Sequence, residues 1–234
     1  LADSFDGDPL NSPNDIAPHP DGSIWFTDPP YGGLLSEGHP DAPGGPGNPN
    51  GLYDPTIGNG GVRPVGGIRR VLQTNVYRLD PSGRLDVVIA GNQLPDPNGL
   101  CFSPDYKTLY VVSTGPGPGD TGPGGKGVIY AFDVQGNTVS NMRLFSDCMV
   151  DGVQCGPDGL RADRAGNIWS GSNAPLGYAG VIVLNPAGKL IGRIRLPEVC
   201  ANVCFAGPKR DFLFMAASQS IYMLRVNIQG AAPG

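Results

Sequence analysis

Short apolar segments alternate with turns rich in Gly and Pro along most of the chain. One pattern occurs four times: an Asn or Asp opens an apolar strand, a turn follows, and a second apolar or aromatic strand comes after it. These units occupy residues 13–27, 97–112, 157–170 and 201–215. Apolar and polar residues alternating between turn signals predict β-strands, and no long helical pattern interrupts the series.

A pair of strands follows each of the first three units. The predicted pairs are 76–79 with 85–89, 128–132 with 139–145, and 181–184 with 190–194. Each pair is joined by a turn that contains Gly, which is typical of a β-hairpin. Each complete repeat therefore predicts four antiparallel strands.

The spacing of the units favours a β-propeller over a sandwich or barrel. Asp158 and Asn202, which open the third and fourth units, are about 44 residues apart, a spacing typical of propeller blades. The wider spacings are explained by insertion loops at 32–70 and 115–127. We predict an all-β fold, with a single propeller domain over 1–234. Its blades are predicted to start near residues 11, 95, 156 and 199.

The two ends of the chain suggest that the ring has further blades. Residues 1–14 parallel residues 88–98, which end one predicted blade and enter the next, and residues 221–226 form only a third strand of the last blade. We expect that about two N-terminal blades are missing from this chain and are needed to close the ring, since unpaired sheet edges would otherwise remain. The alternative is a four-bladed ring in which residues 1–5 complete the last blade.

Charge and hydropathy exclude several classes of partner. The net charge is -5, and no run of Lys or Arg is longer than Arg69-Arg70, so we expect no nucleic-acid partner. No apolar stretch is long enough to span a bilayer, and we expect no membrane partner. The sequence at Leu1 shows no leader segment, which leaves the compartment open, with a periplasmic or secreted location preferred to a cytoplasmic one.

The five cysteines leave their pairing open. Cys148 and Cys155 flank a turn at Asp151-Gly152, so they could form a disulfide in an oxidising compartment or remain as thiols. The sequence contains no CxxC motif, which makes a zinc cluster the weaker interpretation.

One repeated position carries the candidate chemistry. Asn14, Asn98, Asp158 and Asn202 open the first strands of the four units, and first strands line the central channel of a propeller. Converging amide and carboxylate oxygens suit a hard cation such as Ca²⁺. Asn-Gly and Asp-Gly also form ordinary turns, but their recurrence favours a site. Asn202 lacks the Pro-Asn-Gly setting, and we assign it to a supporting position.

These motifs resemble those of the gluconolactonase, senescence-marker and luciferin-regenerating enzyme family. The segments that carry the resemblance are NSPNDIAPHPDGSIWFTDPPYG, PNGLCFSPDYKTLYVVS, PDGLRADRAGNIW and LPEVCANVCFAGPKRDFLFMAASQSIYML, which follow one another in that order. The resemblance extends from Leu1 to about Val226, outside the two Gly-rich insertions.

The resemblance implies a six-bladed β-propeller, of which this chain encodes about four blades. It also implies one divalent cation, with Ca²⁺ the expected ion and Zn²⁺, Mg²⁺, Mn²⁺ or Fe²⁺ as alternatives, and a small-molecule lactone of a sugar acid as substrate. Asn98 and Asp158 would be cation ligands, and Asn14 a ligand or substrate contact. Members of the family also use a first-blade Glu that this chain does not contain.

Further residues are assigned to substrate binding. Asp15, the neighbour of Asn14, and Tyr31 and Asn202 would contact the lactone or line its entrance. Some members of the family carry an Arg two residues before the Pro-Asn-Asp Asn, where this chain has Ser12, and this departure bears on the choice of substrate.

Asp158 is the predicted catalytic residue, acting as a general base on water or as a nucleophile. In the alternative, Asp158 is only a cation ligand. A second hypothesis for the whole protein is a non-catalytic binding or scaffold module with a structural metal site. Ser12 and the large insertions motivate that second hypothesis.

Overall fold

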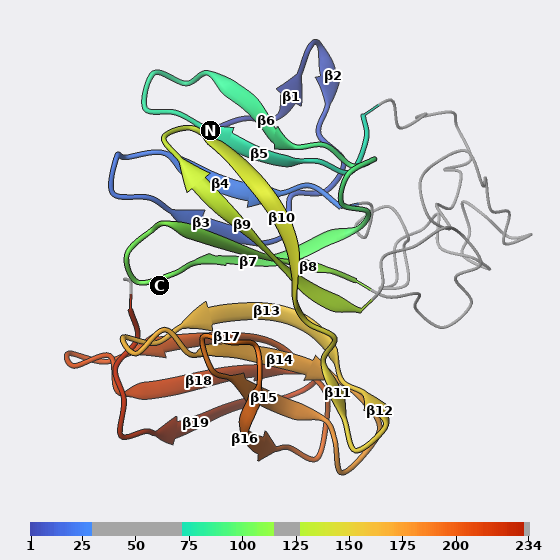
Figure 1. The fold of residues 1–234 in the computed structure, drawn as a ribbon, viewed down its shortest axis with the longest axis vertical. Coiled ribbons are helices and arrows are strands. Elements are labelled where there is room, and N and C mark those ends of the chain that lie inside the picture. Colours follow the sequence, from blue (N-terminus) through green and yellow to red (C-terminus); the bar gives the residue numbers. More distant parts are fainter. Residues whose placement is uncertain (30–71, 115–126, 232–234) are drawn as a thin grey trace, which may run out of the picture.

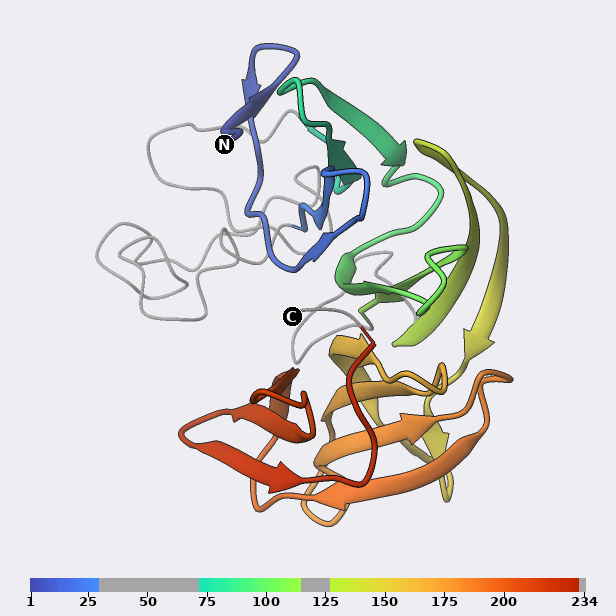
Figure 2. The same cartoon turned by 90° about the vertical axis from the view of Figure 1, so that its left-hand side faces the viewer.

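The computed structural model describes residues 1–29, 72–114 and 127–231. In these ranges the ordered elements are all β-strands, and no helix long and apolar enough to cross a membrane is found. Four sheets follow one another around an arc, as the blades of a propeller do (Figure 1, Figure 2). The prediction of an all-β propeller with four repeated units is confirmed.

Three sheets have four antiparallel strands in chain order, and the last described sheet has three. We number these blades 1 to 4. Blade 1 consists of β3 (Ile16–Pro18), β4 (Ile24–Thr27), β5 (Val76–Leu79) and β6 (Leu85–Ile89). Blade 2 consists of β7 (Pro97–Phe102), β8 (Thr108–Ser113), β9 (Val128–Gln135) and β10 (Thr138–Ser146). Blade 3 consists of β13 (Gly156–Ala162), β14 (Ile168–Asn173), β15 (Gly180–Leu184) and β16 (Leu190–Arg195). Blade 4 consists of β17 (Cys200–Ala206), β18 (Phe212–Ala217) and β19 (Ile221–Arg225).

The first residues of the chain do not end an outer blade strand, as their likeness to residues 88–98 predicted. Strands β1 (Ser4–Phe5) and β2 (Asp8–Pro9) pair with each other and do not continue an outer blade strand. The turn between them has positive φ at Asp6 and Gly7, a conformation that favours a tight local hairpin. Phe5 packs on Tyr77 of blade 1 with ring centroids 5.2 Å apart. The alternative in which residues 1–5 complete the last blade is therefore wrong.

Apolar side chains between adjacent blades form the core. Trp25 and Leu100 are fully buried between blades 1 and 2, and Leu160 and Ile182 between blades 2 and 3. Leu213 packs with side chains of blade 3 in the third cluster. Burial of each such side chain contributes about 1.5–3 kcal/mol, so the blade interfaces hold the inner strands in place.

The inner strands of blades 2 and 3 contain the same irregularity. In β7, Pro97 pairs with Ser113 but Leu100 pairs with Val111, so one residue is extra at Asn98-Gly99. Strand β13 has the same shift at Asp158-Gly159. A β-bulge of this kind redirects side chains at the end of a strand. The two motifs thus open their strands in equivalent conformations.

Glycine allows these inner strands to approach each other closely. A methyl group on Gly99 would lie 2.1 Å from the carbonyl oxygen of Asp158, and one on Gly159 would lie 2.1 Å from Cγ of Asn202. At Gly99 the obstacle is backbone, so no side chain larger than hydrogen fits, whereas at Gly159 the Asn202 side chain would have to move. The glycine of each motif therefore brings the polar residue of the next blade against it.

A short hairpin joins blades 2 and 3, and the end of the described chain packs on blade 3. Strands β11 (Met149–Val150) and β12 (Val153–Gln154) form a hairpin between blades 2 and 3. Cys148 and Cys155 flank this hairpin as buried, free thiols, so the structure does not contain the disulfide considered above. After β19 the chain returns to blade 3, where the Ala231 amide donates to the Ala162 carbonyl.

Candidate functional site

Asn98 lies at the bulge of β7 and is buried, with 6% of its surface exposed. Its Nδ2 donates to Oγ1 of Thr114 at 3.0 Å. Its Oδ1 is buried and has no hydrogen-bond partner in the described part of the chain. A buried amide oxygen without a partner is costly, and a bound cation is one way in which it can be satisfied.

Asp158 lies at the equivalent bulge of β13, next to Asn98. Burial raises the pKa of Asp158 to about 7, and the charge of Asp15 contributes to the rise, while hydrogen bonds from Gly159 and Asn98 oppose it. A carboxyl group with a pKa near neutrality can accept and release a proton during a reaction. The environment therefore suits either acid-base chemistry or cation binding.

Asn202 is the third predicted residue that the structure brings to this place. Its side chain lies against Gly159, directly beside the Asp158 position. Its Oδ1 accepts the Val203 amide hydrogen at 2.8 Å, so this oxygen already has a partner. Asn202 thus adjoins the Asn98 and Asp158 pair, with its oxygen turned to its own backbone.

Asn14 and Asp15 come from the start of blade 1. Asn14 is exposed and borders, together with Asp15 and Phe26, a hollow of about 290 Å³. Asp15 is buried, with 4% of its surface exposed, and its carboxylate accepts the amide hydrogen of Leu100 in β7 at 3.3 Å. The substrate contacts assigned to both residues stay predictions. Tyr31 lies outside the described residues.

Arg161 is a residue that the sequence analysis missed. Its Nη1 and Nη2 each donate to one oxygen of Asp15 at 3.1 Å, which makes a two-pronged ion pair between blades 3 and 1. Its position in the sequence could have marked it as a site residue, because Arg161 is the one basic residue in the four inner strands β3, β7, β13 and β17.

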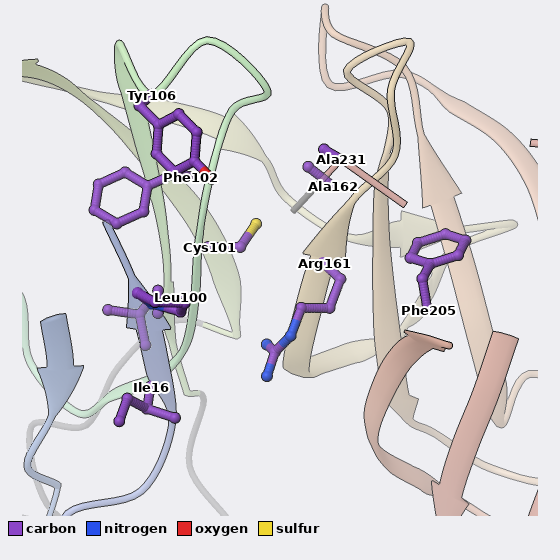
Figure 3. Close-up of a pocket in the computed structure, with 11 residues that line it drawn as sticks. Ile16, Leu100, Cys101, Phe102, Tyr106, Arg161, Ala162, Phe205 and Ala231 are labelled. Carbon is purple, nitrogen blue, oxygen red and sulfur yellow. The ribbon is translucent and has the colours of Figure 1, made fainter. Parts of the chain in front are cut away.

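A small apolar cavity of about 40 Å³ adjoins Arg161, deeper along the inner strands than the bulges. Figure 3 shows the Arg161 side chain reaching from its strand toward the one that carries Ile16. The other walls are mostly apolar and include Leu100, Cys101, Phe102 and Phe205. The ion pair therefore separates the polar bulges from an apolar region.

The donors at the bulges suit one type of cation. Within 1–29, 72–114 and 127–231, no three His, Cys, Asp or Glu side chains gather as a metal cluster. A cation here would thus depend on amide oxygens together with the Asp158 carboxylate. Oxygen-only donors of this kind fit a hard ion such as Ca²⁺, and the unpartnered Oδ1 of Asn98 agrees with that fit.

Comparison with known proteins identifies relatives of the chain. Residues 1–219 match the model of the SMP-30/Gluconolactonase/LRE-like region. A gluconolactonase of Zymomonas mobilis is 30% identical over 235 residues, which cover 98% of this chain and 54% of that protein. Lactonohydrolase oryL of Aspergillus oryzae is 28% identical over 245 residues, which cover 99% of this chain and 48% of that protein.

A solved structure agrees with this relationship. The gluconolactonase of Xanthomonas campestris superimposes with a TM-score of 0.69 at 31% identity, over 96% of this chain and 60% of that one. The chain spans about half the length of the curated relatives it matches.

Proposed function

The chain belongs to the SMP-30/gluconolactonase/LRE-like family, and we propose that it takes part in the metal-dependent hydrolysis of small lactones, with the lactones of sugar acids as the substrate class. The relatives named gluconolactonase and lactonohydrolase support the reaction class. The observation that carries the proposal for this chain is the buried Oδ1 of Asn98, which has no hydrogen-bond partner among the described residues, in a side chain that hydrogen-bonds to the Asp158 carboxyl.

Asn98 and Asp158 would hold the cation, and Asn14 would join them as a ligand or a substrate contact. When bound, the cation supplies Lewis-acid chemistry that stabilises negative charge on the lactone carbonyl oxygen. Ca²⁺ is the ion that best suits these oxygen donors, while Mg²⁺, Mn²⁺, Zn²⁺ and Fe²⁺ are alternatives for the test below.

Asp158 could act as a general base, as a nucleophile or as a cation ligand alone, and the general-base role is the one we propose. As a general base it takes a proton from water, whose oxygen bonds to the carbonyl carbon; the ring C–O bond then breaks and the proton ends on the released hydroxyl or on the solvent. As a ligand alone it would hold the cation and leave proton transfer to solvent. The pKa of Asp158, raised to about 7, supports the general-base role.

Substrate size and selectivity would depend on the residues around this site. Asp15 and Asn202 are proposed to lie near the substrate. Ser12 is half-buried, and its hydroxyl donates to the Pro29 carbonyl at 2.5 Å. A hydroxyl held in this way cannot form the two-pronged contact of an Arg, so we expect weaker binding of polar sugar-acid groups at this position.

We also propose that the arc is part of a six-bladed ring. At one end of the arc, blade 1 borders the hollow described above with Ile24, Phe26 and Leu79. At the other end, β19 has one strand neighbour among the described residues, and Ile221 and Met223 are 77% and 58% exposed. Two further blades would cover both surfaces. A structure of the intact protein with four or five blades would overturn this count.

The decisive experiment is chelation of the intact protein followed by readdition of single cations. We expect hydrolysis of an aldonolactone to be lost after chelation and restored by Ca²⁺ or another divalent ion. Full activity after thorough removal of the metal would overturn the metal dependence. Cation binding without turnover of aldonolactones or simple esters would instead support a binding module with a structural metal site.

A further inference from the structure

Asp15 occupies a position that glycine holds in the two matched motifs. In the repeat, Asn14-Asp15 corresponds to Asn98-Gly99 and to the equivalent pair in β13. Blade 1 therefore places a second buried carboxylate at the level of the candidate site. Its charge contributes to the raised pKa of Asp158, so the two groups influence each other.

The Asp15 carboxylate accepts hydrogen bonds from residues of three blades. Oδ1 accepts the Ile16 amide hydrogen at 2.9 Å and Oδ2 accepts that of Leu100 at 3.3 Å. Arg161 contributes one N–H to each oxygen at 3.1 Å. Residues of three blades thus meet at one carboxylate, and Arg161 supplies the opposite charge.

We propose that Arg161 is a positioning residue that neutralises Asp15 and holds it away from the bound cation, so that Asp15 does not become an additional carboxylate ligand beside Asp158. This inference rests on the proposed function of the site. The planar guanidinium can engage both oxygens of Asp15 at once, a geometry that Lys cannot reproduce. Arg161 acts through Asp15, and no contact between Arg161 and the substrate is required.

The charge balance explains why such a residue is needed. Without Arg161, the site would contain two buried carboxylates of like charge, and both would attract the cation. The cation would be held more tightly, and its ability to polarise a carbonyl would fall because more of its charge would be neutralised. A second ligand would also change the position that the cation takes relative to the substrate.

The test compares Arg161→Met, Asp15→Asn and the double variant in the intact protein. Ca²⁺ affinity is measured by calorimetry on the chelated protein, alongside lactone turnover at saturating Ca²⁺. We expect Arg161→Met to bind Ca²⁺ roughly tenfold more tightly and Asp15→Asn to bind it roughly tenfold more weakly, because each leaves one unbalanced charge near the cation. The double variant should return to within about threefold of the wild type.

If charge balance is the role of Arg161, the two single variants change Ca²⁺ affinity in opposite directions and the two changes cancel in the double variant. A merely structural ion pair would give weaker binding in both single variants, or unchanged affinity and turnover with lower thermal stability, and either result would overturn the proposal. Arg161→Lys keeps the charge without the paired geometry. If Arg161→Met does not fold, the proposal still requires near-native Ca²⁺ affinity in Arg161→Lys together with weaker binding in Asp15→Asn.

Arg78 provides a matched control. Its side chain is buried and pairs with Asp21 at 3.1 Å, in the turn at the far end of β3 from Asp15. Arg78→Met should lower thermal stability and leave Ca²⁺ affinity unchanged. Calorimetry also separates the two proposals: wild-type protein that binds Ca²⁺ without lactone turnover contradicts the proposed function, while the affinity pattern of the variants still tests Arg161.

Discussion

The inner strands of blades 2 and 3 differ from those of blades 1 and 4 in a way that divides the site into two parts. Strands β7 and β13 share a Pro, a polar residue, a Gly and the same bulge. Blade 1 has Asp15, directly before β3, in place of the Gly, and β17 has its register shift between Cys200 and Asn202.

Under the proposed function, this difference separates cation binding from support of the site. The matched strands present Asn98, whose oxygen has no hydrogen-bond partner among the described residues, and Asp158, whose pKa is raised to about 7. The side chains from the unmatched strands, Asp15 and Asn202, are already engaged with protein groups. Similar positions in a repeat can therefore take different roles when one neighbouring residue changes.

Gly99→Ala should have the largest effect, because it breaks the match between β7 and β13. The new methyl group would meet the Asp158 carbonyl at 2.1 Å, and the strands would have to separate. We expect a loss of about 3 kcal/mol or more in the free energy of unfolding, measured with urea, together with loss of activity.

Gly192→Ala in β16 is the control, since the nearest heavy atoms to its new methyl group are in Val183 at 3.9 Å. It should stay within about 1 kcal/mol of the wild type. Equal stability of the two variants would contradict the close approach of the inner strands.

Asp158→Asn makes the two matched strands chemically alike. An amide cannot accept the proton, so kcat for an aldonolactone should fall by roughly 10²-fold to 10⁴-fold if Asp158 is the general base. The variant is nearly isosteric, and circular dichroism should show a native fold. Retention of both activity and Ca²⁺ affinity would contradict the catalytic role.

Asn98→Ala and Asn202→Ala compare a matched strand with an unmatched one. The first removes an oxygen without a partner, whereas the second removes one already bonded to Val203. We expect Ca²⁺ affinity to fall about tenfold for Asn98→Ala and less than about threefold for Asn202→Ala, by calorimetry. A larger loss for Asn202→Ala would reverse the assignment.

Thr114→Val should give the smallest effect. The Thr114 hydroxyl accepts Nδ2 of Asn98 and so fixes which end of the amide is left free. We expect a fall of about threefold in Ca²⁺ affinity, since the ligand itself remains. Thr114→Ser, which keeps the hydroxyl, should bind like the wild type; an equal loss in both variants would exclude the hydrogen bond as the cause.

The sequence predicted the repeat because each strand carries its own local signal. The pairs 76–79 with 85–89 and 181–184 with 190–194 were found from alternation and turn residues alone. The opening hairpin was not predicted, because residues 1–14 resemble residues 88–98, whereas the hairpin depends on the local turn at Asp6-Gly7.

Part of the candidate site could not be predicted from the sequence, because it depends on contacts between residues that are distant in the chain. Asp15 and Arg161 are far apart in the sequence and meet only when blades 1 to 3 stack around the channel. The bulges were hidden for a different reason: Pro-Asn-Gly describes a turn as well as it describes an extra residue at the start of a strand. Only the pairing of Pro97 and Leu100 with β8 distinguishes the two.

The close contact at Gly99 has a consequence for redesign of this scaffold. Because the main chains of neighbouring blades touch at this point, the separation of the proposed cation ligands Asn98 and Asp158 would be set by backbone dimensions and not by the volume of nearby side chains. Large apolar residues between the outer strands could then be exchanged to raise thermal tolerance without altering which ion is preferred. Ion preference would have to be changed at the inner strands themselves.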